Sequence, residues 1–166
     1  MRPLHPLRWI AGPMLLAILA TWLLTVPLKV FGLQLPEPVW ALAPLFAWAV
    51  IRPSILAPFA VLAMGVAMDL LWGGALGQWP LALLIAYGAI FAARPGLVGQ
   101  SRPIMWAWYA FACALAMGAA WLIGLMDAGG RPQVVGMVWQ YLATLLAYPF
   151  ADYLIERFED ADVRFR

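Results

Sequence analysis

Residues 54–77, SILAPFAVLAMGVAMDLLWGGALG, combine an apolar run, a single carboxylate and a glycine-rich turn. The run 54–72 has about the length that crosses a bilayer, which takes roughly 20 residues with a range of about 17–25. Its carboxylate, Asp69, lies about one helical turn before the end of the run. A charge at the centre of a membrane helix costs about 2.5–3.5 kcal/mol, so we expect Asp69 to face protein near the turn rather than lipid.

The composition of the whole chain favours a membrane protein. Of its 166 residues, 66% are hydrophobic and 11% are charged, and the mean hydropathy is +0.87. Soluble domains are about 45–50% apolar and about 25% charged. A soluble fold of this size would leave too much apolar surface in water, whereas a bilayer accepts an apolar outer face.

Six apolar runs follow one another with short connections, and none of the connections is long enough for a separate domain. We therefore expect an all-α membrane protein, a compact bundle of about six transmembrane helices that forms one multi-pass domain over residues 1–166. The second run is short for a span and contains Pro44, so it could also be re-entrant. The first run is longer than a signal-peptide core and is interpreted as a retained span. The predicted spans are 9–31, 39–51, 54–72, 79–93, 104–126 and 134–155, followed by a cytoplasmic tail, 156–166.

The positions of the basic residues predict which connections face the cytoplasm. If all six runs cross, eight of the ten basic residues lie on the cytoplasmic side, and only Lys29 and Arg131 lie outside. If 39–51 is re-entrant, seven of the ten lie outside. The positive-inside rule favours the first arrangement, with both termini in the cytoplasm. These scattered cations are topology signals, so we expect no nucleic-acid partner.

The chain has few groups for chemistry. It has no asparagine, one cysteine (Cys113), one histidine (His5) and serines only at the predicted boundary positions 54 and 101. Nucleophilic catalysis needs a nucleophile beside a base, and no such motif is present in the sequence. We therefore expect a non-enzymatic protein with no metal and no cofactor. Asp69 has two interpretations, a hydrogen-bond network that fixes the turn or a role in binding or transport, and Asp152 is interpreted as an interfacial carboxylate.

The run 104–126 carries small residues at every fourth position, on one helix face. One row is Ala110, Ala114 and Gly118, and a second is Ala112, Ala116 and Ala120. Such rows let helices approach closely in lipid. They either pack inside this protein's own bundle or receive a partner's transmembrane helix. The tail 156–166, with mixed charges, is interpreted as solvated, as an extension of the last helix or as a segment on the membrane surface.

The chain resembles the MreD family of bacterial rod-shape-determining membrane proteins over most of its length. The most specific stretch is Gly65, Asp69, Gly73, Gly74 and Gly77 followed by 79–87, similar to the family pattern G-x-x-x-D-x-x-x-G-x-x-x-G. The resemblance implies a component of the cell-elongation machinery for peptidoglycan synthesis. It implies direct binding to MreC, and direct or indirect association with MreB, RodA and a class B penicillin-binding protein, within membrane lipid.

The resemblance also implies a fold similar to the substrate-binding subunits of energy-coupling-factor transporters. That likeness leaves a second function open, a small-molecule binding subunit of a membrane transporter. Such capture needs convergent polar groups. The predicted outer half offers Asp69, Gln78, Gln140 and tryptophans for it.

Overall fold

The computed structural model describes residues 6–24, 29–30, 33–34, 37–51, 54–97, 99–126 and 134–163. The regular secondary structure in this part of the chain is helical apart from one short hairpin, in which Lys29 pairs with Gln34 and Val30 with Leu33. The helices are α1 (Pro6–Leu24), α2 (Leu42–Ile51), α3 (Leu56–Trp72), α4 (Gln78–Leu97), α5 (Arg102–Met126), α6 (Val134–Leu145) and α7 (Tyr148–Val163), and the strands are β1 (Lys29–Val30) and β2 (Leu33–Gln34).

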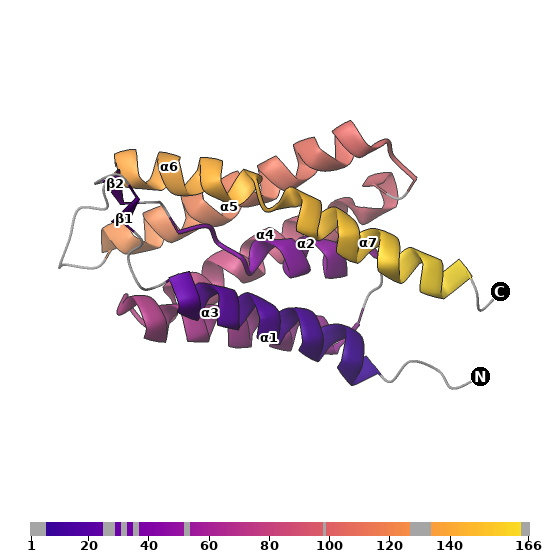
Figure 1. The fold of residues 1–166 in the computed structure, drawn as a ribbon, viewed down its shortest axis with the longest axis horizontal. Helices are drawn as coiled ribbons and strands as arrows, with labels where there is room; N and C mark the ends of the chain where they lie inside the picture. The colour runs from indigo at the N-terminus through magenta and orange to yellow at the C-terminus, as the bar shows by residue number, and fades with distance from the viewer. Residues whose placement is uncertain are drawn as a thin grey trace.

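The helices form an elongated bundle and run roughly along its long axis (Figure 1). The start of α1 and the end of α7 lie at the same end of the bundle, and the connection from α4 to α5 lies there too. The β1–β2 hairpin and the start of α6 lie at the opposite end. Helices α1, α3 and α5 run toward the hairpin end, and α2, α4 and α6 with α7 run back, which places the connections in two groups at the two ends.

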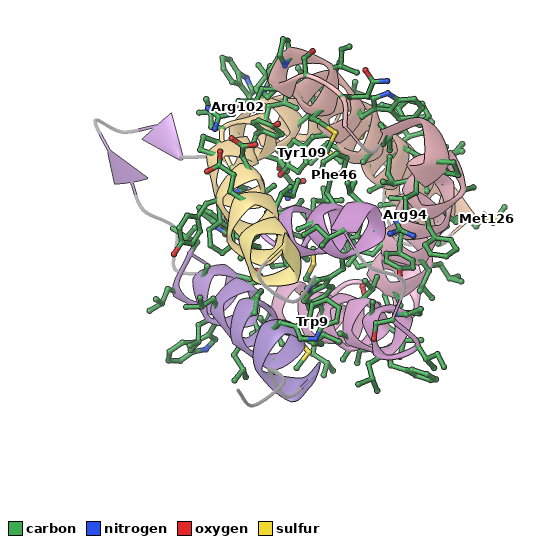
Figure 2. All side chains as sticks on the ribbon, turned by 90° about the vertical axis from the view of Figure 1, so that its right-hand side faces the viewer. Trp9, Phe46, Arg94, Arg102, Tyr109 and Met126 are labelled. Atoms are coloured by element: carbon green, nitrogen blue, oxygen red, sulfur yellow. The ribbon has the colours of Figure 1, made fainter. Side chains whose placement is uncertain are left out.

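The short helix α2 is the centre of the bundle. Its residues Leu42–Val50 are all buried, and helices α1, α3, α4, α5 and α7 contact it. A helix that is apolar on every side belongs in a core. Phe46 of α2 and Tyr109 of α5 meet edge to face with ring centres 5.5 Å apart (Figure 2). Pro44 lies in the first turn of α2, where a missing N–H breaks no helical hydrogen bond.

The first predicted span is wrong in part. The first was expected to be helical over 9–31, but α1 ends at Leu24 and Lys29–Val30 forms a strand. Residues 25–28 and 31 of this run lie outside the described residues.

The last predicted span, 134–155, is long and apolar enough to cross a membrane, and a turn at 146–147 divides it into α6 and α7. Pro149 has no N–H to give to the carbonyl of Leu145, so the helix stops and begins again. Helix α7 then continues to Val163, so most of the tail 156–166 extends the last helix and residues 164–166 lie outside the described residues.

Among the described residues, three helices are long and apolar enough to cross a membrane: α4, α5 and the segment Val134–Glu156, which joins α6 to most of α7. The apolar helices Trp9–Leu24, Leu42–Ile51 and Leu56–Trp72 are shorter. The outer surface of the bundle is rich in exposed large apolar side chains, which a water-facing surface rarely gathers on this scale. They include Leu15, Leu19 and Leu23 on α1; Phe59, Leu62 and Leu70 on α3; Phe111 and Leu122 on α5; and Val138, Trp139 and Leu142 on α6.

Candidate functional site

The carboxylate of Asp69 caps the start of α4 from its position on α3. Asp69 is 1% exposed. Its Oδ2 accepts the backbone N–H of Gly77 at 2.7 Å, and its Oδ1 accepts that of Trp79 at 3.0 Å. The first amides of a helix have no partner within the helix and need one elsewhere. Asp69 therefore ties the last turn of α3 to the first turn of α4.

The other amides in the first turn of α4 need no further acceptor. The N–H of Gln78 donates to the carbonyl of Ala75 at 3.1 Å, and Pro80 has no N–H to satisfy. The negative charge of a carboxylate is also favourable at a helix N-terminus, because the helix dipole is positive there. Among the described residues no basic side chain pairs with Asp69. Backbone donors alone therefore hold this buried group.

The glycines around Asp69 serve close packing and the turn. A Cβ on Gly65 would lie 2.5 Å from the Cα and N of Pro80, so α3 and α4 touch through their backbones at this point. Gly73 has φ +67° and ends α3, donating its N–H to the carbonyl of Asp69 at 3.0 Å. Gly77 has φ +102°, a conformation that L-residues with a side chain rarely adopt.

Gly74 is the one of these four glycines at which a side chain would meet the least strain or crowding. Its backbone has no positive φ, and a Cβ there would meet only the Gln78 Oε1 at 3.4 Å. The pattern Gly65–Asp69–Gly73–Gly77 thus forms one hydrogen-bonded and closely packed joint between α3 and α4. We call this unit the α3–α4 joint. This geometry agrees with the first interpretation of Asp69, in which a hydrogen-bond network fixes the turn.

Arg94 caps the C-terminal end of α2. Its Nε donates to the carbonyl of Val50 at 2.8 Å, and its Nη2 donates to that of Ile51 at 2.9 Å. The last carbonyls of a helix lack donors, and a cation is favourable beside them. Sequence reasoning treated Arg94 only as a topology signal. One sequence feature could have indicated this role: the run 39–51 is too short to place both of its ends in the headgroup region, so one end needs donors from protein.

Thr144 holds the chain at the entrance to α2. Its Oγ1 accepts the N–H of Val39 at 3.0 Å and donates to the carbonyl of Gln140 at 2.7 Å. The hydroxyl of Tyr109 donates to the carbonyl of Thr144 at 3.2 Å. Thr144 is fully buried, so this polar cluster is enclosed by protein. Both ends of the central helix are therefore hydrogen-bonded to side chains of other helices, and sequence reasoning gave Thr144 no role.

The end of the bundle that holds the termini carries a small ionic cluster. Arg102 pairs with Glu156, and its Nε lies 3.7 Å from Oδ2 of Asp152. The side chain of Arg102 is 73% exposed and that of Asp152 is 25% exposed. Exposed ion pairs contribute about 0–1 kcal/mol, so this cluster links α5 to α7 only weakly.

The two small-residue rows of α5 have different surroundings. Ala112, Ala116 and Ala120 are buried at 0–4% exposure, so that row packs inside the bundle. In the other row Ala114 is exposed, and Ala110 and Gly118 are partly exposed. A Cβ on Gly118 would meet nothing within 4 Å. The hydroxyl of Tyr141 on α6 donates to the carbonyl of Ala110 at 3.2 Å, so α6 reaches only that end of the row.

Within the described ranges no three His, Cys, Asp or Glu side chains come together where they could hold a metal ion. No family model, curated protein or solved structure matches this chain. The expected likeness to MreD and to transporter subunits therefore stays a prediction.

Proposed function

We propose that this chain is a non-enzymatic component of the bacterial cell-elongation machinery, similar to MreD, and that it acts by binding the transmembrane helix of MreC. The observation that carries the proposal is the α3–α4 joint. The resemblance to MreD is most specific at Gly65, Asp69, Gly73 and Gly77, and these residues form a single packed unit. Four matching residues that contact one another in the fold support a family resemblance more strongly than four matching residues that do not.

We further propose that the bundle crosses the inner membrane six times with both termini in the cytoplasm. Helices α1 and α3 have 19 and 17 residues. At about 1.5 Å per residue they are roughly 26–29 Å long, close to the roughly 30 Å thickness of the hydrocarbon core. Helix α2, with 10 residues, is roughly 15 Å long. Other helices surround it, Arg94 bonds to its last two carbonyls and Thr144 bonds to the N–H of Val39 just before it, so protein rather than lipid meets these backbone groups.

The partly open row on α5 is the proposed binding surface for MreC. We define the α5 dock as Ala110, Ala114 and Gly118. In lipid, helices associate by close packing of small residues rather than by the hydrophobic effect. A single-span partner can approach the backbone of α5 at Ala114 and Gly118, where this protein's own helices leave the surface open. MreB, RodA and a class B penicillin-binding protein would associate directly or through MreC.

Co-purification of the tagged protein from mild detergent tests the proposal, with MreC as the expected companion. Gly118→Leu should insert normally, because space surrounds Gly118, but it should lose MreC and give rounded cells. Gly88→Leu is the matched control, because a Cβ on Gly88 also meets nothing within 4 Å, but Gly88 lies on α4. Wild-type protein that brings down a transport ATPase instead of MreC would contradict the proposal and favour the transporter-subunit function.

A further inference from the structure

Helix α6 is attached to the rest of the bundle near its C-terminal end. In the described part of the chain, the hydrogen bonds that join α6 to other segments all involve Tyr141 and Thr144. Thr144 is fully buried, whereas none of the residues 134–140 is buried. The first half of α6 is therefore held much less tightly than its second half.

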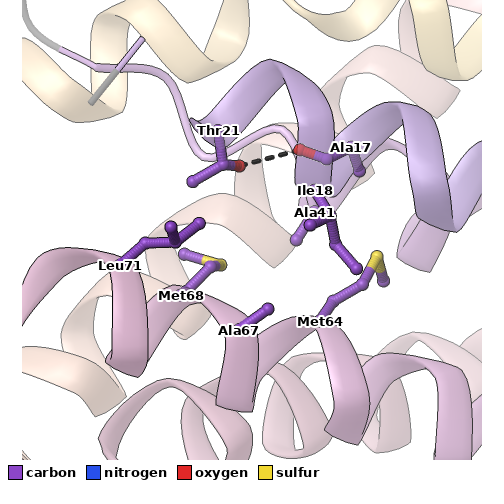
Figure 3. A pocket seen from close by; sticks show the side chains of 8 residues that line it. All are labelled: Ala17, Ile18, Thr21, Ala41, Met64, Ala67, Met68 and Leu71. Atoms are coloured by element: carbon purple, nitrogen blue, oxygen red, sulfur yellow. Dashed lines mark hydrogen bonds between the residues drawn. The ribbon is translucent and has the colours of Figure 1, made fainter. Parts of the chain in front are cut away.

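Helix α1 shows how another peripheral helix looks when it is seated along its whole length. Its buried residues Ile10, Pro13, Ala17 and Thr21 recur at every third or fourth position and form one continuous stripe. The hollow between α1 and α3, lined in part by Thr21 and Met68, leaves no room for a water molecule (Figure 3). The first half of α6 has no such buried stripe.

A cavity of about 190 Å³ separates the first half of α6 from the start of α4. Its lining consists of Gln78 and Trp79 on α4, Met117, Ala120 and Trp121 on α5, and Gly136, Met137 and Gln140 on α6. Fully packed helices leave few voids larger than a water molecule, and the atoms around a void lose contacts. The cavity therefore marks a place where α6 has both the room and an energetic reason to move closer to α4.

The walls of the cavity on α4 and α6 carry side-chain amides that can pair. The Nε2 of Gln78 donates to the carbonyl of Ala120 at 2.9 Å, and its Oε1 accepts no hydrogen bond from the described residues. The side-chain amide of Gln140, which is partly exposed, makes no hydrogen bond within that same part of the chain. Glutamine side chains that hydrogen-bond across two helices stabilise helix pairs in lipid.

We propose that the first half of α6 is a pivoting flank that closes onto α4. In the closed position the side-chain N–H of Gln140 donates to Oε1 of Gln78, and direct contact between α4 and α6 replaces the cavity. The computed structure is the open position, in which the cavity separates the two walls.

The pivot lies at the buried end of α6. Thr144 anchors that end, and the turn at 146–147 lets α6 tilt while α7 stays packed against α2. At about 1.5 Å per residue, Val135 lies roughly 13 Å along the helix from Thr144, so a tilt of about 20° moves Val135 by about 4–5 Å. The same tilt hardly moves residues beside Thr144.

The test measures distances between pairs of spin labels by pulsed electron paramagnetic resonance, on the full-length protein in lipid nanodiscs. One label replaces Val135 at the free end of α6, and the other replaces Leu70 on α3; both residues are exposed. The control pair joins Leu70 to Leu142, which is exposed near the anchored end. Cys113 is buried, so the labels attach to the introduced cysteines. We expect two distance populations for Val135–Leu70, up to about 4–5 Å apart, and one for Leu142–Leu70.

Two variants test how the flank closes. Gln140→Leu removes the amide and should lower the ratio of closed to open protein at least about threefold. Gly136→Leu should remove the closed population, because its side chain fills the cavity and a Cβ there meets nothing within 4 Å. Gln100→Leu is the matched control, because the Gln100 amide is exposed and bonds only to the carbonyl of Gly96, and it should keep the wild-type ratio.

Three results would overturn the proposal. They are a single population for Val135–Leu70, an equal separation of populations for Leu142–Leu70, and a wild-type ratio of closed to open protein in Gln140→Leu. No elongation partner takes part in the experiment, so the proposed function stands or falls separately.

Discussion

Replacement of Asp69 by leucine removes the acceptor for two backbone donors at once. The N–H groups of Gly77 and Trp79 each bond to a separate oxygen of the carboxylate. A donor left unpaired in a buried position costs about 1–3 kcal/mol, and the lost charge at the helix N-terminus adds about 0.3–1 kcal/mol. Asp69→Leu should therefore lower the free energy of unfolding by about 2–7 kcal/mol.

Asp69→Asn separates the role of the acceptors from that of the charge. The sequence alone predicts a mild effect, because an amide keeps an acceptor oxygen. The structure changes this prediction, because both oxygens are in use and an amide would turn its NH₂ toward one of the two N–H groups. We expect a loss of about 1–3 kcal/mol, intermediate between wild type and Asp69→Leu.

Unfolding in mixed detergent micelles, followed by tryptophan fluorescence, measures these differences. Asp152→Leu is the matched control, because Asp152 is a partly exposed carboxylate that makes a weak pair with Arg102 and accepts one long hydrogen bond, of 3.4 Å, from Tyr148. It should change the free energy of unfolding by at most about 1 kcal/mol. If Asp69→Leu is as stable as wild type, Asp69 does not stabilise the α3–α4 joint. If Asp69→Asn and Asp69→Leu lose the same free energy of unfolding, the charge of Asp69 matters rather than its number of acceptor oxygens.

Three further predictions concern packing, capping and topology. Gly65→Ala should fail to accumulate, because its Cβ would lie 2.5 Å from the backbone of α4, whereas Gly118→Ala should accumulate normally; immunoblots of membranes compare the two. Arg94→Lys keeps the positive charge but cannot reproduce both guanidinium hydrogen bonds to the end of α2. The free energy of unfolding should therefore fall by about 1.5–3 kcal/mol, and the topology should not change. An unchanged free energy of unfolding would leave Arg94 as a topology signal alone. Cysteines introduced at Ser101 and Gly130 should be labelled from opposite sides of the membrane, and labelling from one side would contradict six crossings.

The sequence predicted the helices best where a single local signal decided them. Long apolar runs marked α3, α4 and α5, and the glycines after Asp69 marked the end of α3. The orientation of Asp69 was also predictable, because the cost of a carboxylate in lipid leaves few alternatives.

The predicted spans differ from the helices where hydropathy and backbone chemistry disagree. The run 134–155 stays apolar through Pro149, but proline cannot donate the hydrogen bond that continues a helix, so a turn divides this run into α6 and α7. Hydropathy therefore joined segments that the backbone separates.

The two ends of α2 could not be predicted from local sequence. Arg94 bonds to carbonyls 43 and 44 residues earlier in the chain, and the Thr144 side chain bonds to an amide 105 residues away. Such pairs depend on how the helices are arranged in space. The openness of the α5 dock was unpredictable for the same reason, because both small-residue rows have the same spacing and only the packing of α4 and α6 distinguishes them.

Photo-crosslinking from the α5 dock in living cells tests the proposed function most directly. A photoreactive amino acid at Ala114 should form a covalent adduct with MreC, because Ala114 is exposed in the row where the partner's helix would lie. The same amino acid at Leu62, which is exposed on α3, should give no such adduct. No adduct with MreC from Ala114, or equal adducts from both positions, would contradict the account.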